Sequence, residues 1–596
     1  MATDDTRWKR LQAGPASVLS QWWMNAAEYL DRSVGWDKLP RALGLPTVIG
    51  LRERLQHDNL FDTGVPDSNG FPLAQCAYRA ADGRWNDLAH PMMGAVETHF
   101  GRNVRPAQHI PESEPALLTP NPRTVSLTLL TRDRFLPATT LNMLAGAWLQ
   151  FEIHDWFSHG TSKENPFTLP VESGDPSHGE AVVIERTRRG TGPGVFPNED
   201  THWWDGSQIY GSCAEKQAKV RDGARLKVEG DTIPGYLADD FFDFSGRHAG
   251  FWTGSAALHS LFALEHNAIC EHLAKMEWRL RGDQEKLFQT ARLVNAALMA
   301  KIHTTEWTPA IIAHPTTRVG MKMSWWGVSE RLKRSIGRVS TNEAISGIPG
   351  SPSNHYGVPY SLTEEFAAVY RMHPLVPDDF VFRSPFGGTE RRHMSLAELR
   401  TTQAIPVLRD VGMPAVLYTF GISHPGALTL HNYPRTLQEF DRGGKLSDLA
   451  ATDILRDRER GVPRYNRFRE AFHKAPVQQF DQLSVNPTWV EEMREVYDGD
   501  IDNVDLMIGL LAEPPPRGFG FSDTAFRVFL LMASRRLKSD RFFTDCYNEE
   551  HYTKAGLDWI DNNSMKTVLL RHFRRELEDV LEPIENAFRP WAPVAG

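Results

Sequence analysis

Cysteine is scarce in this chain, which has four cysteines among 596 residues. Cys76, Cys213, Cys270 and Cys546 lie far apart and form no Cys-x-x-Cys pair, so the sequence indicates neither a zinc site nor a disulfide framework. Scarce cysteine fits a reducing compartment. The polar stretch 1–10 lacks the apolar core of a signal peptide. We therefore expect an intracellular protein, either cytoplasmic or peripherally associated with a membrane.

Long apolar runs, basic stripes and low-complexity linkers are missing as well. The longest charge-free apolar stretch, residues 136–151, is shorter than the about 20 residues that cross a bilayer. We interpret it as a buried helix and expect no transmembrane helix. The net charge is −9 and no stripe is basic, which argues against a nucleic-acid partner. The 39 prolines and 45 glycines are spread along the chain, so no linker divides the sequence into several domains.

Aromatic residues and helical periodicity are what the chain has in quantity. Its 17 tryptophans and 31 phenylalanines suit the burial of a flat cofactor and an apolar substrate, although large enzymes often have aromatic cores. The pattern of apolar residues predicts helices over 141–157, 255–273, 286–303 and 363–373. The last must end near His373, because Pro374 disfavours helical geometry in the residue before it. Few segments alternate as strands do. We predict a mainly α fold with long loops and little β structure.

The N-terminal region predicts further helices with many aromatic residues. Residues 17–57 contain Trp22, Trp23 and Trp36 on moderately amphipathic patches. Packing on the body of the protein is the favoured interpretation, and contact with a membrane surface is the alternative. We assign residues 1–60 to this helical segment and residues 61–596 to one larger domain.

The first candidate site is a histidine backed by an amide. Gln150 and His154 are four residues apart, so both project from one face of the predicted helix. Such a pair is suited to moving a proton between the two oxygens of a peroxide. Asp155 is turned about 100° away, toward a different site. Taken alone, a histidine on an apolar helix is more often a structural residue.

The second candidate is a set of hard oxygen donors. Thr201, Asp205 and Ser207 lie at even spacing around Trp203, and in an extended loop such residues point the same way. Two hydroxyls, a carboxylate and backbone carbonyls are ligands that calcium prefers, and Asp155 could complete the set. By itself this segment is more simply interpreted as an ordinary polar turn.

Two weaker candidates follow along the chain. Tyr370 and His373 are three residues apart and would share a helix face, so if His373 binds an iron, Tyr370 lies beside the same cofactor as an oxidisable phenol. His303 and Thr308, with a distant arginine such as Arg541, could hold a carboxylate by charge-assisted hydrogen bonds.

Together, and in this order, these segments resemble the animal-type haem peroxidase superfamily. The Glu-His-Asn at 265–267 and the late stretch 453–466 fit the same pattern. The closer resemblance is to the fatty acid α-dioxygenases of that superfamily. The segments that carry it span nearly the whole chain: VGWDKLPRALGL (34–45), NMLAGAWLQFEIHDWFSH (142–159), WWDGSQIYGS (203–212), AKIHTTEWTPAII (300–312), YRMH (370–373) and DRFFT (540–544).

The resemblance implies a role for each matched residue. His154 would be the distal histidine assisted by Gln150, His373 the proximal haem ligand with Asn432 hydrogen-bonded to it, and Tyr370 the radical residue. It also implies calcium ligands at Asp155, Thr201, Trp203 (through its carbonyl), Asp205 and Ser207, and a carboxylate site made by His303, Thr308 and Arg541.

The resemblance also implies an activity. The enzyme would add O₂ at C2 of a fatty acid through a tyrosyl radical, with a peroxide as activator and haem b and Ca²⁺ as cofactors. Secreted mammalian peroxidases carry an aspartate, esterified to the haem, just before the distal histidine. Ile153 stands there in this chain, so the haem would be non-covalent. The alternatives are a plain haem peroxidase, a mid-chain fatty acid oxygenase of the cyclooxygenase type, or a haem-binding or peroxide-sensing protein without turnover.

Overall fold

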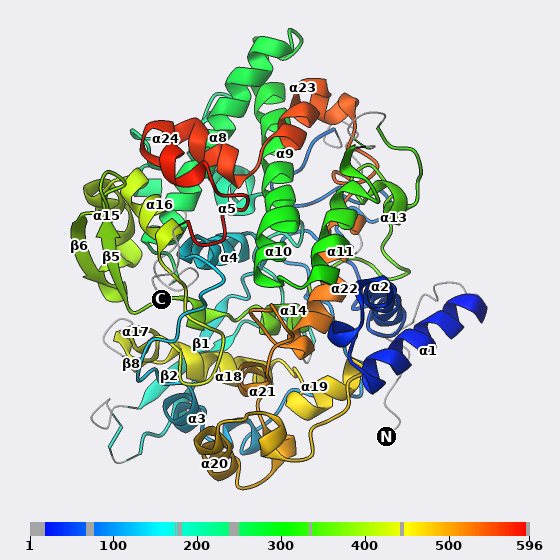
Figure 1. Ribbon diagram of the computed structural model, residues 1–596, viewed down its shortest axis with the longest axis vertical. Helices are drawn as coiled ribbons and strands as arrows, with labels where there is room; N and C mark the ends of the chain where they lie inside the picture. Colours follow the sequence, from blue (N-terminus) through cyan, green and yellow to red (C-terminus); the bar gives the residue numbers. More distant parts are fainter. Residues whose placement is uncertain are drawn as a thin grey trace.

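In the computed structural model, most of the described residues are helical, and the strands among them form four two-stranded sheets (Figure 1). The structure describes residues 18–66, 77–172, 174–175, 181–192, 194–237, 250–331, 333, 337–441 and 446–591. The mainly α fold predicted from the sequence is confirmed. Residues 1–10 and Cys76 lie outside the described ranges, and the three cysteines inside them are free thiols.

Buried helices from distant parts of the chain form the centre of the molecule. The helix α4 starts at Asn142, whose side chain accepts a hydrogen bond from the Ala145 N–H, and almost all of its residues are buried. It packs on α8 and α16, while α8 packs on α9. The central helices are α4 (Met143–Trp156), α8 (Thr253–Met276), α9 (Gln284–Ile302), α10 (Thr308–Ile311), α14 (Glu364–Val369), α16 (Met413–Ile422) and α22 (Asp523–Ser539).

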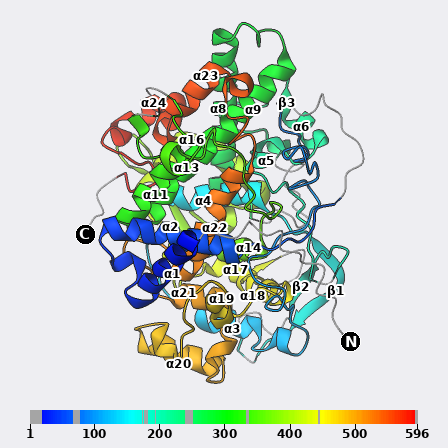
Figure 2. The same ribbon diagram turned by 90° about the vertical axis from the view of Figure 1, so that its right-hand side faces the viewer.

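The remaining helices surround this centre, as Figures 1 and 2 show from two sides. They are α1 (Val18–Ser33), α2 (Arg41–Asp58), α3 (Pro122–Leu129), α5 (Ser207–Tyr210), α6 (Ala214–Val220), α11 (Pro315–Trp326), α13 (Glu343–Ser346), α15 (Ala404–Val411), α17 (Arg435–Gln438), α18 (Leu449–Glu459), α19 (Tyr465–Ala471), α20 (Pro487–Val496), α21 (Leu506–Ala512), α23 (Glu549–Asn562) and α24 (Met565–Leu581). Single 3₁₀ turns are η1 (Trp36–Lys38), η3 (Ala116–Leu118), η5 (His373–Leu375), η6 (Leu396–Leu399), η7 (Thr401–Gln403), η8 (Phe480–Gln482) and η9 (Ile501–Asn503).

Each sheet is an antiparallel pair. The strands are β1 (Thr161–Leu169), β2 (Val182–Thr187), β3 (Arg221–Asp222), β4 (Arg225–Leu226), β5 (Asp379–Arg383), β6 (Glu390–Ser395), β7 (Phe440–Asp441) and β8 (Leu446–Ser447). In the longest pair, Thr161 faces Thr187 and Leu169 faces Val182, with an irregularity in between. Leu169 and Val182 pack with Leu455 in a small separate core, so this hairpin lies against α18.

Two helix boundaries differ from the sequence prediction. The helix expected over 363–373 ends at Val369, and His373 begins the separate turn η5. Tyr370 already has non-helical backbone angles, because the chain must leave helical geometry before His373-Pro374. Tyr370 and His373 therefore do not share the face of one helix. The apolar stretch 136–151 is helical only from Met143, since Asn142 caps the helix there.

The N-terminal helices are fastened to the body by a buried charge cluster. The Trp36 indole N–H donates to Asp523 Oδ1 at 2.8 Å, and Asp523 also pairs with Arg527 and Lys474. Arg527 in turn reaches Asp31 of α1. The helix α2 packs on α11 and α22, beside which Figure 1 shows it. These contacts attach the segment 1–60 through its described residues.

Within the described ranges, one bent pair of helices has the length and apolar composition that a membrane span needs. It consists of Thr401–Val411 and Met413–Ile422, which meet at an angle of 97°. No single helix of the described residues has that length and composition.

Asp523→Asn should lower the free energy of unfolding by roughly 1.5–3 kcal/mol, because it removes the carboxylate that pairs with Lys474 and one of the two that pair with the buried Arg527, which keeps Asp31. Burial alone would raise the pKa of Asp523, but Arg527 and Lys474 outweigh it and hold the pKa well below its ordinary value. The ionic contribution is therefore complete above about pH 4, where the unfolded chain ionises, and is lost only in stronger acid. Urea unfolding should show a constant difference from the wild type between pH 7 and 5 that shrinks below pH 4; equal stabilities at pH 7 would refute the role.

Candidate active site

Two cavities meet at Tyr370, which lines both. The histidine cavity, with a volume of about 360 Å³, is lined by Gln150, His154 and His373 among others. The apolar cavity, with a volume of about 110 Å³, is lined by His303, by Thr308 and mostly by apolar side chains. The structure thus brings the first and third sequence candidates, and His303 and Thr308 of the fourth, together around one phenol.

In the histidine cavity, α4 supplies the predicted Gln150–His154 face. The Gln150 amide donates to the Gly250 carbonyl at 2.5 Å and accepts from the Trp252 indole N–H at 2.5 Å. Both ends of the amide are therefore held, and its position beside His154 is set by the chain around 250–252. Ile153 lines the same cavity, one residue before His154.

His373 has a carboxylate partner that the sequence analysis did not name. Its Nδ1 lies 3.0 Å from Oδ2 of Asp453, on α18. Burial would raise the pKa of Asp453, but the charges around it, including Arg371, keep the pKa below its ordinary value. An ionised Asp453 orients the imidazole and leaves Nε2 for the cavity. The side chain of Asn432, predicted for this contact, instead accepts hydrogen bonds from Arg132 and the Leu136 N–H and donates one to the Ala427 carbonyl.

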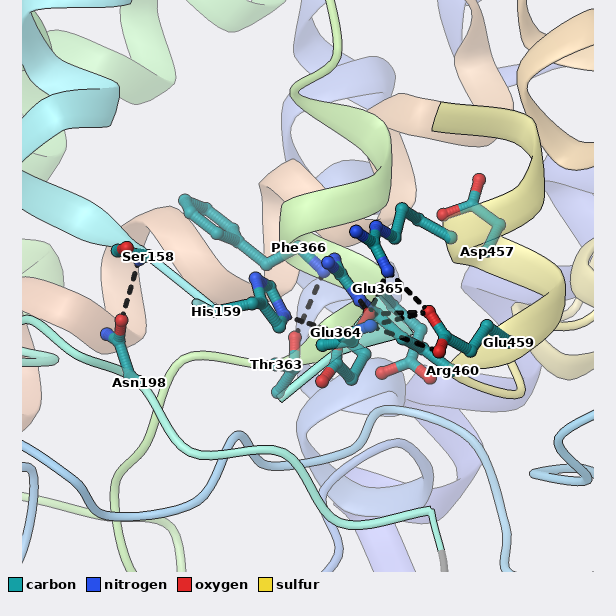
Figure 3. A network of polar contacts seen from close by, with 12 residues as sticks. Ser158, His159, Asn198, Thr363, Glu364, Glu365, Phe366, Asp457, Glu459 and Arg460 are labelled. Atoms are coloured by element: carbon teal, nitrogen blue, oxygen red, sulfur yellow. Dashed lines mark hydrogen bonds and ion pairs between the residues drawn. The ribbon is translucent and has the colours of Figure 1, made fainter. Parts of the chain in front are cut away.

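Cationic side chains from α18 and its end line the histidine cavity. Arg456 and Arg460 belong to this lining, together with His159. Figure 3 shows the polar network that includes His159 and Arg460. In it, His159 Nε2 lies 2.8 Å from Oε2 of Glu364, on α14. Burial would raise the pKa of Glu364, but the charges of His159, Arg460 and Arg102 lower it to about 2. A ligand with anionic groups would therefore meet cations at this wall.

The predicted oxygen-ligand cluster is also assembled. Asp155 Oδ1 accepts hydrogen bonds from the N–H and Oγ–H of Ser207 at 2.6 and 2.8 Å, and Ser207 N–H also lies 3.2 Å from Asp205 Oδ1. Burial and the nearby charge of Asp205 raise the pKa of Asp155 to about 8. Thr201 and Trp203 are buried in the same loop.

The geometry of this cluster is compatible with a cation. Asp155 Oδ2 is buried without a hydrogen-bond partner in the described part of the chain, whereas Asp205 has the buried cations Arg292 and Arg79 near it. Two buried carboxylates so close together repel each other unless a proton or a cation lies between them. Within the described ranges, no group of three or more His, Cys, Asp or Glu side chains could hold a metal, so a cation here would need hydroxyl or carbonyl oxygens as further ligands.

In the apolar cavity, a change of helix type presents the polar side chains. The helix α9 continues as a π-helical turn, η4 (His303–Trp307), before α10. Pro309 lacks the N–H of a normal helical bond, and the widened turn accommodates it. The Trp148 indole N–H donates to His303 Nδ1 at 3.2 Å, so Nε2 carries the ring hydrogen. Burial, with the charge of Arg536, keeps the pKa of His303 well below its ordinary value, so the ring is neutral.

The arginine in this cavity is Arg536, not the predicted Arg541. Arg541 follows the end of α22 at Ser539, and its guanidinium is bonded to the carbonyls of Trp85 and Asn86 and to Cys546. Arg536 lies on the last turns of α22 and lines the cavity. Its Nε and Nη2 have no hydrogen-bond partner among the residues described, and the Thr308 hydroxyl has none there either.

Trp156 joins these groups to Tyr370. Its ring centroid lies 5.2 Å from that of Tyr370 and 5.4 Å from that of His303, edge to face in both cases. The Arg536 guanidinium lies 4.3 Å from the centroid of the Trp156 ring. Burial raises the pKa of Tyr370 above its ordinary value, so the phenol keeps its hydrogen at neutral pH.

Sequence reasoning thus missed Arg536, Asp453 and Trp156. Each lies in or beside a segment that carries the resemblance, so the sequence did contain a clue to it. Arg536 is an arginine five residues before Arg541, and Asp453 is the first residue of the 453–466 stretch. Where helix α22 ends decides which arginine faces the cavity, and no residue pattern states that.

Comparisons with known proteins agree with this geometry. Residues 78–583 match the animal haem peroxidase family. The chain is 36% identical to alpha-dioxygenase 1 of Arabidopsis thaliana, covering 96% of this chain and 93% of that protein. It is also 36% identical to alpha-dioxygenase PIOX of Pisum sativum, over 94% and 90%.

Solved structures give the same answer. A fatty acid alpha-dioxygenase of Arabidopsis thaliana superposes with a TM-score of 0.88 at 34% identity, covering 98% of this chain and 94% of that one. A tyrosine-to-phenylalanine variant of the Oryza sativa enzyme, crystallised with palmitic acid, superposes with a TM-score of 0.90 at 30% identity, over 97% and 98%. This chain therefore belongs to the animal haem peroxidase family and, within it, to the alpha-dioxygenases.

Proposed function

We propose that the chain is a haem-dependent fatty acid α-dioxygenase that adds O₂ at C2. The observation that carries the proposal is the position of Tyr370, which lines both cavities. On one side are His154 and His373, and on the other are His303 and Arg536. A phenol between a redox centre and an acid-binding site is what a tyrosyl-radical oxygenase requires.

The histidine cavity fits a haem. His373 would ligate the iron through Nε2, with Asp453 at its other nitrogen, and His154 would move the proton of a bound peroxide. Arg456 and Arg460 would face the propionates. Ile153 has no carboxyl to esterify the haem, so binding would be non-covalent. When bound, haem supplies the oxidising power, drawn from a peroxide activator, that turns Tyr370 into a radical.

The apolar cavity fits a fatty acid. Its carboxylate would accept hydrogen bonds from His303, Thr308 and Arg536, and its chain would lie along the apolar lining. The Tyr370 phenoxyl takes a hydrogen atom from C2, leaving a carbon radical and a restored phenol. O₂ adds to that carbon, and the peroxyl radical takes the hydrogen back from Tyr370, which gives a 2-hydroperoxy acid and renews the tyrosyl radical.

The position of the head group favours this reaction over the alternatives. The ring contacts of Trp156 place Tyr370, His303 and Arg536 around one side chain, so an anchored carboxylate brings C2 to the phenol rather than a mid-chain carbon. A plain peroxidase has no need of an acid-binding cavity at Tyr370. Mass spectrometry of the products separates C2 oxygenation from mid-chain oxygenation.

Tyr370→Phe should abolish oxygen uptake with a saturated fatty acid while the haem still reacts with peroxide. The substitution keeps the ring and its packing and removes only the hydroxyl that forms the radical. Oxygen electrode traces and the Soret band measure the two properties on the same sample. Oxygen uptake near the wild-type rate would exclude the radical role.

Arg536→Gln should raise the KM for fatty acid by about 10- to 100-fold, because a hydrogen bond to a charged group contributes roughly 1.5–3 kcal/mol. Arg541→Gln is the matched control: it breaks bonds to Trp85 and Asn86 outside the cavity, so it should lower thermal stability with little change in KM. The opposite pattern in the two variants would return the anchoring role to Arg541.

A second proposal concerns calcium at Asp155 and Asp205. Metal analysis should find about one Ca²⁺ per chain, with Thr201, Ser207 and the Trp203 carbonyl completing the ligands. Chelation should lower the thermal midpoint of the wild type, because the two buried carboxylates then repel each other. Asp155→Asn removes that repulsion together with the ligand, so its midpoint should not respond to the chelator. A wild type that holds no calcium would dismiss the site.

A third proposal is peripheral contact with a membrane through α1. Trp22 and Tyr29 are 68% and 71% exposed, and the neighbouring α2 supplies Val48 and Ile49 to the wall of the apolar cavity. Replacing both exposed aromatics with serine should reduce co-sedimentation with phosphatidylcholine vesicles. Trp278→Ser, at a side chain 74% exposed beyond α8, is the control. Equal binding of all three proteins would contradict the proposal. An intracellular location stays a prediction.

A further inference from the structure

Arg536 is held by aromatic rings. Its guanidinium carbon lies 4.3 Å from the centroid of Trp156, 4.6 Å from that of Trp204 and 5.5 Å from that of Phe366. These distances are within the range of cation–π attraction, for which tryptophan is the strongest partner. The rings hold the cation in place without using up its hydrogen bonds, and its Nε and Nη2 have no partner in the described part of the chain.

The two tryptophans of this cage differ in one respect. The Trp204 indole N–H donates to Glu152 Oε2 at 2.8 Å. The Trp156 indole N–H is buried and has no hydrogen-bond partner among the described residues, although the side chain is only 1% exposed and lines the apolar cavity. A buried donor without an acceptor is unfavourable and calls for a ligand that satisfies it.

We propose that Trp156 binds the head group of the substrate: its indole N–H donates to the acid, and its ring fixes Arg536 for the same purpose. This rests on the proposed function and adds a donor from α4 to those from α10, α22 and the π-helical turn. Trp156 also lies edge to face with Tyr370, so the head group is bound by the side chain that packs on the radical residue. An anionic acid is favoured over its ester or amide, because its negative charge pairs with Arg536 and strengthens the hydrogen bond from the indole N–H.

The test measures binding without turnover, in haem-loaded Tyr370→Phe protein with a saturated fatty acid. Introducing Trp156→Phe should raise the Kd about tenfold or more, as expected for the loss of a hydrogen bond to a charged group. Trp204→Phe is the matched control. It also replaces an indole ring that packs on Arg536, but the N–H that it removes already donates to Glu152, so the Kd should rise less. Equal losses in the two variants, or none in Trp156→Phe, would overturn the assignment of the indole N–H.

A spectroscopic signature separates binding from a structural role. The ultraviolet resonance Raman band that reports indole N–H hydrogen bonding should shift when the acid is added, and the shift should be missing in Trp156→Phe. If that variant fails to load haem, 3-benzothienylalanine at position 156 keeps the bicyclic ring and lacks only the N–H. A shift that survives this replacement would also overturn the proposal. If the Tyr370→Phe parent binds no fatty acid at all, the proposed function itself fails.

Discussion

The active site depends on one geometric constraint: an α-helix turns about 100° per residue, so three consecutive side chains face three directions. On α4, His154 lines the histidine cavity, Asp155 bonds Ser207 in the oxygen-ligand cluster, and Trp156 lines the apolar cavity. The helix is buried along nearly its whole length, so it cannot rotate without exposing apolar surface. One element therefore fixes the relative positions of three sites with different chemistry.

Buried charge is the second feature that organises the molecule. Most buried cations here are balanced by carboxylates, as Arg527 is by Asp523 and Arg371 is by Asp457. Arg536 is the informative contrast, because aromatic faces surround it and part of its guanidinium keeps free donors within the described structure. A cation held in this way is available to a ligand, whereas one already paired, such as Arg527, supports the fold.

The two cavities divide the chemistry between them. The histidine cavity has cations and imidazoles on its walls and suits a polar-edged cofactor, while the apolar cavity suits a chain with one charged end. Among the described residues of the proposed mechanism, Tyr370 lines both cavities. Burial raises the pKa of its hydroxyl, so the phenol keeps its hydrogen until the hydrogen is removed as an atom. Separation lets the peroxide reaction and the substrate reaction be altered independently, which a single shared pocket would not allow.

Local sequence determined much of this protein. Helix periodicity predicted α4, α8 and α9, the Gln150–His154 spacing predicted a shared helix face, and the segment matches identified the family. These features depend on neighbours a few residues apart, whose relation is set by backbone geometry. The end of α14 before Tyr370 was not predicted. Tyr370 and His373 line the same cavity because tertiary packing brings them there, not because they are spaced along one helix.

Only the tertiary structure decided which partners meet across long separations. Asp453 rather than Asn432 lies at His373, and Arg536 rather than Arg541 faces His303. Both choices depend on where a helix ends and how it is rotated against its neighbours, which is a property of the packed core as a whole. The sequence names the candidates of the right chemistry, and the packing of α18 and α22 selects among them, because a side chain acts only where the folded backbone directs it.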